Sequence, residues 1–147
     1  MSPSTTLTPR IIGQAEKTIN AILFRLLAGP GLTEAQWITL TLTAAGGGST
    51  GRGQLVAQVA HGLKVGEAQA REHLASLVAA QLVADPGDDA APVRFTARGT
   101  QVFEQIRGAT AEVVKRLWGD LSAEDLATAG RVLTIITERA DAELARA

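Results

Sequence analysis

Residues 54–95 decide the fold: QLVAQVAHGLKVGEAQAREHLASLVAAQLVADPGDDAAPVRF. Apolar side chains recur at helical spacing over residues 54–63, and again after a break at 64–66 as far as about Gln81. This pattern predicts two short helices joined by a tight turn, which is typical of a helix-turn-helix. The second helix has the size that fits the major groove of DNA.

The residues that follow predict a β-hairpin. Residues 82–84 are apolar and follow the second helix at once, and residues 93–95 alternate between apolar and charged as in a half-buried strand. Between them, residues 85–92 are rich in turn formers and acids. The hairpin therefore has a long acidic tip, and the whole stretch reads as a winged helix.

Two helices are predicted before this stretch. The first covers residues 8–27, with Thr8 as its cap and Pro9 at its first position. The second opens with a capping box, in which a Thr33 cap is followed three residues later by Gln36.

Two more helices are predicted after it. Thr96 caps a long helix over residues 97–118, and Ser122 caps a last helix that runs to about residue 145. The fold class is therefore mainly α, with one small hairpin. We expect a single domain, 1–147, in which 33–96 form the winged helix-turn-helix. The helices of 8–30 and 97–145 have apolar faces with little to pack on except each other, which favours a dimerisation region.

Residues 46–53, GGGSTGRG, invite comparison with a phosphate-binding loop. That motif needs Lys where Arg52 stands and a hydroxyl where Gly53 stands, and a strand should precede it. We therefore expect a flexible turn between helices and no nucleotide site.

Composition excludes several classes of protein. The chain has 147 residues, a net charge of −1 and no cysteine, which removes disulfides, iron–sulfur clusters and thiol catalysis. No apolar run is long enough for a membrane span, and the first ten residues, MSPSTTLTPR, lack the order of a signal peptide, so we expect a cytoplasmic protein. His61 and His73 are the only histidines and fall short of a closed zinc site. No nucleophile–base pair is present, so we expect no enzyme, no catalytic residue, no metal and no cofactor.

Four motifs resemble those of the MarR family of bacterial transcription regulators. They are LTEAQW at 32–37, LVA at 55–57, LVAAQLV at 77–83 and FTARG at 95–99, and the resemblance covers roughly 8–145. It implies a homodimer that binds double-stranded DNA at a pseudo-palindromic operator, usually as a repressor. It also implies release by a small aromatic or phenolic ligand held between the dimerisation and DNA-binding regions.

The predicted DNA contacts are polar or basic side chains of the helix-turn-helix and the wing: Arg52, Lys64, Gln69, Arg71, His73 and Arg94. Arg71 suits guanine and Gln69 suits adenine, whereas Arg52 and Lys64 would hold phosphates. An ordinary solvated surface is the other reading of each.

The wing departs from the family pattern. Asp88-Asp89-Ala90 stands where an Asp-Arg-Arg stretch is typical, and Gln81 stands where the family favours glycine, which predicts a different backbone there. Residues 50–99 contain five basic and five acidic side chains, so this module is neutral. The alternative function is therefore a degenerate winged-helix dimer that binds a ligand or a protein partner and not DNA.

Trp37 is either a core residue or the wall of a ligand pocket that it would form with Ile19, Leu23 and Leu40. Trp118, at the end of the long helix, is expected in the dimer interface.

Overall fold

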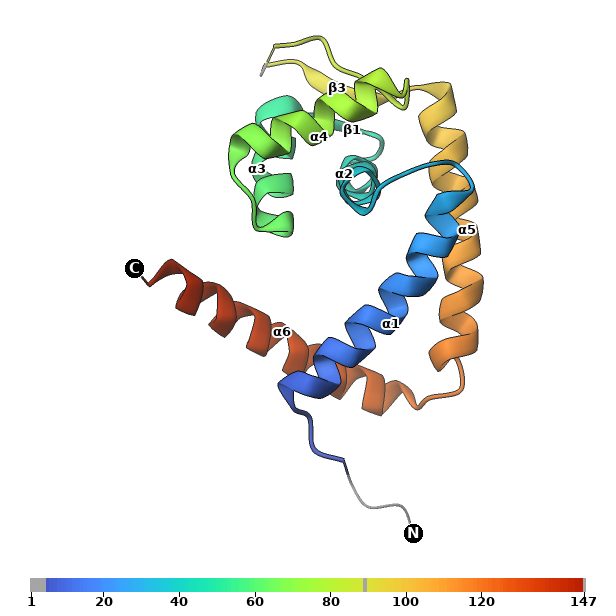
Figure 1. Cartoon of the computed structure of the whole chain (residues 1–147), viewed down its shortest axis with the longest axis vertical. Helices are drawn as coiled ribbons and strands as arrows, with labels where there is room; N and C mark the ends of the chain where they lie inside the picture. Colours follow the sequence, from blue (N-terminus) through green and yellow to red (C-terminus); the bar gives the residue numbers. More distant parts are fainter. Residues whose placement is uncertain (1–4, 89, 147) are drawn as a thin grey trace. The chain divides into compact units, whose positions relative to one another are not determined.

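The computed structural model describes residues 5–88 and 90–146. Most of these residues are helical, and a small antiparallel sheet completes the fold, so the predicted class is confirmed (Figure 1). In chain order the elements are α1 Pro9–Ala28, α2 Glu34–Ala45, β1 Ser49–Gly51, α3 Arg52–Leu63, α4 Glu67–Ala79, β2 Val83–Ala84, β3 Pro92–Phe95, α5 Ala97–Trp118 and α6 Ala123–Ala145.

The described residues fall into two compact units. The first extends to Thr110 and the second begins at Ala111, so the division lies within α5. No helix of the described residues is both long and apolar enough to cross a membrane.

The predicted helix caps are present. The Thr8 hydroxyl accepts a hydrogen bond from the backbone N–H of Ile11 at 3.2 Å. At α2 both halves of the capping box form: Thr33 accepts from the backbone of Gln36, and the Gln36 side chain accepts from the backbone of Thr33. At α6 the Ser122 hydroxyl accepts a hydrogen bond from the backbone N–H of Asp125 at 3.0 Å. These bonds satisfy backbone donors that a helix start otherwise leaves unpaired.

The core of the first unit lies where α2, α3, α4 and the sheet meet. Aliphatic side chains fill most of it, and the largest of those that are fully buried are Leu27, Leu40, Leu55, Val56, Val59, Leu74, Leu77, Leu82 and Val93. Close packing of these side chains holds the two helices of the helix-turn-helix against the sheet.

The prediction of a flexible turn over 46–53 is wrong for its second half. Gly47 and Gly48 make the turn, with φ of 77° and 86°, and β1 follows at once. β1 pairs with β3 in antiparallel register, with Thr50 opposite Val93, and the strand order is β1-β3-β2. A third strand thus extends the predicted two-stranded hairpin, because β3 offers a second edge for backbone hydrogen bonds.

Two helix ends differ from the prediction. α3 begins at Arg52, two residues before the expected Gln54, and α4 ends at Ala79, before the expected Gln81. Gln81 has φ of 62°, in the left-handed region that glycine favours. The prediction that Gln81 changes the backbone of this turn is therefore wrong, since it adopts the conformation that a glycine would.

Candidate nucleic-acid interface

The turn between α3 and α4 is short and tightly bonded. Lys64 closes α3 in the left-handed conformation, with φ of 57°, and its side chain is exposed. The backbone N–H of Val65 donates to the carbonyl of Ala60 at 3.0 Å. This bond sets the angle at which α4 leaves α3. Lys64 lies on the turn itself, close to the start of the second helix.

α4 turns one face into the core, and this face fixes where its polar residues lie. Ala70, Leu74 and Leu77 are buried. Gln69 and Arg71 flank Ala70, and each lies about 100° around the helix from it, in opposite directions. Gln69 is exposed and Arg71 is half-buried. The two side chains predicted to read bases thus lie on opposite flanks of the helix.

The face of α4 opposite the core carries small residues and one acid. Ala68, Glu72, Ala75 and Ala79 are all exposed and follow one another at helical spacing. The sequence prediction named the polar residues Gln69 and Arg71 and did not identify this face. The helical spacing of its residues from the buried Ala70 would have identified it.

Arg52 ties the start of α3 to the base of the wing. Its Nε donates to Oδ2 of Asp85 at 3.0 Å, with 21% and 12% of the two side chains exposed. The other carboxylate oxygen of Asp85 accepts from the backbone N–H of Gly87. Asp85 directly follows β2, so the ion pair links α3 to the wing. Arg52, which is predicted as a DNA contact, therefore has a structural partner within the chain.

Arg94 lies on β3 between the two neighbouring strands. It stands opposite Ser49 on β1 and Ala84 on β2, and its side chain is exposed. At the tip of the wing, Asp88 is exposed and accepts from the backbone N–H of Ala90. Asp89, the other half of the predicted acidic tip, lies outside the described residues.

A chain of hydrogen bonds joins α2 to α4. Nε2 of Gln36 donates to the Ser76 hydroxyl at 3.1 Å, and that hydroxyl donates to the His73 carbonyl at 2.9 Å. His73 itself is half-buried. The residue that closes the α2 capping box thus also positions α4.

The residues of the predicted ligand pocket range from the core to the surface. The Trp37 ring, 9% exposed, stacks on Phe103 of α5 with 5.5 Å between centroids. Leu40 is fully buried, Leu23 is half-buried and Ile19 is 42% exposed. Trp37 therefore packs in the core, and Ile19 and Leu23 form the accessible part of this set.

The two histidines lie on separate helices. His61 is on α3 and exposed, whereas His73 is on α4. Within residues 5–88 and 90–146, no three His, Cys, Asp or Glu side chains are grouped to hold a metal ion.

No protein-family model matches the sequence, and no curated protein matches it. Solved structures do match: ligand-free NadR has a TM-score of 0.75 and 19% identity, covering 95% of this chain and 100% of that chain. NadR in complex with 4-hydroxyphenylacetate has a TM-score of 0.70 and 21% identity, covering 89% and 95%. A MarR protein from Peptoclostridium difficile has a TM-score of 0.71 and 18% identity, covering 97% of each chain. At such identities these likenesses show a common fold over nearly the whole chain.

Proposed function

We propose that this chain, whose fold is the winged-helix fold of the MarR-family regulators, is a ligand-responsive, DNA-binding transcription regulator of the bacterial cytoplasm. The observation that carries the proposal is a helix-turn-helix whose second helix is exposed along its outer face and is followed by a wing. The proposed DNA contacts are Arg52, Lys64, Gln69, Arg71, His73 and Arg94. The protein acts by binding, as a repressor, without catalysis or a cofactor.

The proposed functional form is a homodimer. None of the α6 residues is buried, and a stripe of large apolar side chains follows the helix at Leu126, Leu133, Ile136 and Leu144. Exposed apolar side chains that share one helix face are typical of an interface between proteins. The dimer would use the helices of 8–30 and 97–145 and bind a pseudo-palindromic operator.

The proposed effector is a small aromatic molecule. NadR, which shares the fold, was solved with 4-hydroxyphenylacetate. In this chain the proposed contacts are Ile19, Leu23, Trp37 and Leu40, among which Trp37 supplies an aromatic face. Binding there would shift the population of dimers away from the spacing that fits DNA.

A salt titration of DNA binding tests the proposal. The full chain is mixed with a labelled duplex from its own upstream region, and anisotropy is measured from low to physiological salt. We expect binding that weakens as salt rises and that prefers the upstream duplex to a shuffled one of equal composition. The slope should be shallow, since each neutralised phosphate contributes only about −0.9 to it and this module has few basic residues.

A second candidate function is a winged-helix dimer that binds a ligand or protein partner and not DNA. Three observations favour it: the module of residues 50–99 is neutral, the outer face of α4 is alanine-rich with Glu72 on it, and Arg52 is paired with Asp85. A stable dimer that binds neither duplex even at low salt would overturn the first candidate and favour this one.

A further inference from the structure

We propose that Glu72 sets the sequence preference of the DNA-binding surface, by accepting a hydrogen bond from the N4 amino group of cytosine in the major groove. Glu72 has this role within the DNA-binding function proposed above, to which it adds a base contact. Of the four residues on the outer face of α4, which are Ala68, Glu72, Ala75 and Ala79, Glu72 alone carries a charge.

The place of Glu72 on α4 follows from the residues that this helix buries. Ala70, Leu74 and Leu77 form the buried face. Glu72 follows Ala70 by two residues, so it lies about 160° around the helix from it, on the side that points away from the core. A helix that enters the major groove with this side foremost brings Glu72 to the base edges.

Glu72 also projects further than its neighbours on the outer face. Ala68 precedes it by four residues and Ala75 follows it by three, and all three are exposed. Because both alanines end at Cβ, they leave the Glu72 carboxylate free to approach a base. Gln69 and Arg71 lie on opposite flanks of α4, so they would reach toward the two walls of the groove and leave its floor to Glu72.

The Glu72 carboxylate is available to accept hydrogen bonds. In the part of the chain that the structure describes, it forms no ion pair. An ionised carboxylate accepts hydrogen bonds and donates none. In the major groove cytosine presents a donor, adenine a donor beside an acceptor, guanine two acceptors, and thymine an acceptor and a methyl group. Glu72 therefore favours cytosine and opposes guanine and thymine.

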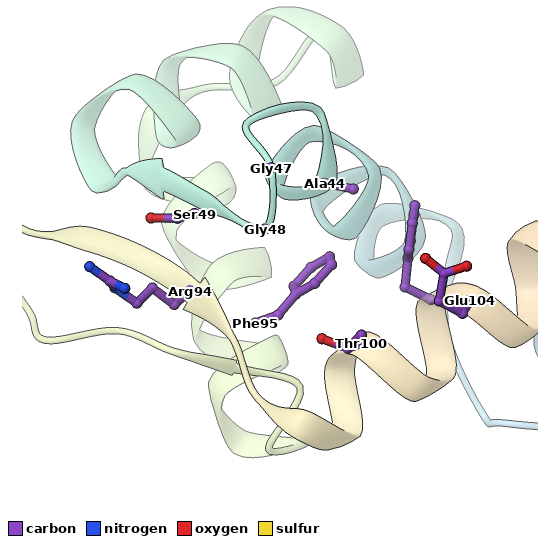
Figure 2. Close-up of a pocket in the computed structure, with 9 residues that line it drawn as sticks. Ala44, Gly47, Gly48, Ser49, Arg94, Phe95, Thr100 and Glu104 are labelled. Carbon is purple, nitrogen blue, oxygen red and sulfur yellow. The ribbon is translucent and has the colours of Figure 1, made fainter.

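Basic side chains of the turn and the wing are placed to hold the DNA backbone. Lys64 is exposed on the turn before α4. Arg94 lies on β3, and its side chain extends away from Phe95, on the side opposite to Thr100 and Glu104 (Figure 2). Contacts to phosphates fix the register of a protein on DNA, and base contacts supply the specificity. Lys64 and Arg94 would supply the former, and Glu72 the latter.

The charge of Glu72 makes binding depend on the sequence. A carboxylate on the outer face of α4 repels phosphates and the acceptor atoms of a wrong base, so it weakens binding wherever no base donates to it. The neutral charge balance of residues 50–99 already limits sequence-independent attraction to DNA. We therefore expect binding to tolerate little change at the cytosine that Glu72 contacts.

Selection from random duplexes tests this role. The full wild-type chain and the variants Glu72→Gln and Glu67→Gln are each mixed with a library of randomised duplexes, and the bound duplexes are sequenced. We expect the wild type to select cytosine at one position of its motif. Glu72→Gln should select adenine there, because a glutamine amide pairs with the N6 and N7 atoms of adenine.

Anisotropy with defined duplexes gives the size of the effect. Replacing the selected cytosine by thymine should weaken binding of the wild type about fivefold or more. Glu72→Gln should bind a shuffled duplex more tightly than the wild type does, because it lacks one negative charge. Both Glu72 and Glu67 are exposed, so the variants should unfold at the temperature of the wild type.

Glu67→Gln is the matched control, because it removes the same charge from the same helix. Glu67 lies in the first turn of α4, about 60° around the helix from Ala70 and hence beside the buried face. This variant should bind duplexes of any sequence more tightly and keep the preference for cytosine. The pair of variants thus separates repulsion by charge from recognition of a base.

Three results would overturn the role of Glu72. If Glu72→Gln selects the motif of the wild type, Glu72 reads no base, whereas the proposed DNA binding stands. If Glu67→Gln loses the cytosine preference as Glu72→Gln does, net charge and not a base contact sets the preference. A wild-type chain that retains no duplex even at low salt would overturn the proposed function and the role of Glu72 together.

Discussion

At the scale of single residues, two backbone positions fix the joint between α4, the wing and α5. Gly99 lies on α5 where the helix passes the backbone of Leu82, and Gln81 holds the left-handed turn just before Leu82. The Thr96 hydroxyl donates to the Gln81 carbonyl, and the Thr96 backbone N–H donates to the Leu82 carbonyl at 3.1 Å. The joint is thus held by backbone geometry, and it tolerates little change in shape.

Gly99→Ala tests the close approach. A Cβ at Gly99 would lie 1.9 Å from the Leu82 carbonyl oxygen, so α5 would have to move away and the bond from Thr96 would stretch. We expect a loss of about 1–3 kcal/mol in the free energy of unfolding, measured by urea denaturation. Gly108→Ala on the same helix meets nothing within 4 Å and should instead stabilise by up to about 1 kcal/mol. Equal effects of the two substitutions would contradict the close approach.

Gln81→Gly tests the strain at the end of α4. A non-glycine residue at φ of 62° lowers the free energy of unfolding by about 1–2 kcal/mol. Glycine removes this strain, but its greater freedom in the unfolded chain offsets about 0.5–1 kcal/mol of the gain. We expect a net gain of up to about 1 kcal/mol in thermal or urea unfolding. The control is Gln101→Gly, within α5, which should lower the free energy of unfolding by about 1 kcal/mol. A loss at position 81 as large as that at position 101 would refute the strain.

At the scale of elements, the wing is held by an ion pair as well as by strand pairing. Arg52 at the start of α3 and Asp85 after β2 are mostly buried, and β3 is paired on both of its edges. The wing is therefore anchored at its base from two directions. α4 is anchored too, through the Gln36–Ser76 hydrogen bond to α2. Both proposed DNA-binding elements thus rest on bonds that sequence patterns do not reveal.

A double-mutant cycle on Arg52 and Asp85 tests the anchor of the wing. Each alanine substitution should lower stability by about 1.5–3 kcal/mol, because the remaining partner loses a charge-assisted bond in a mostly buried place. The double variant should lose clearly less than the sum of the two. The exposed pair Glu104–Arg107 is the control, with a coupling of about 0.5 kcal/mol or less. Similar coupling energies for both pairs would show that the Arg52–Asp85 ion pair stabilises the wing no more than an exposed ion pair does.

At the scale of the whole molecule, α6 carries a stripe of exposed apolar side chains, which bears on the proposed dimer. Leu133 lies near the middle of that stripe, and Ala142 lies about two and a half turns further on, hence on the opposite side of the helix. Both side chains are exposed. The pair therefore provides a test of the proposed dimer and a matched control on one helix.

Leu133→Glu should convert the dimer to a monomer at micromolar concentration, because a charge in an apolar interface is left without a partner. Light scattering after size exclusion measures the mass directly. Ala142→Glu adds the same charge to the other side and should remain dimeric. A wild-type chain that is monomeric, or a Leu133→Glu variant that stays dimeric, would remove this stripe from the proposed interface.

The sequence by itself determined the helices, their caps and the wing, because these depend on local signals. Thr8, the Thr33–Gln36 capping box and Ser122 act on backbone groups three residues away, and apolar spacing marks each buried helix face. Such interactions can be predicted from the sequence because their partners are only a few residues apart.

The tertiary structure alone decided what depends on residues distant in sequence. β1 forms only because β3 pairs with it across more than forty residues, and Arg52 meets Asp85 only once the wing has folded. The outer face of α4 likewise depends on which of its side chains pack into the core. Local signals set each element, whereas long-range packing set the surfaces that a ligand or DNA would meet.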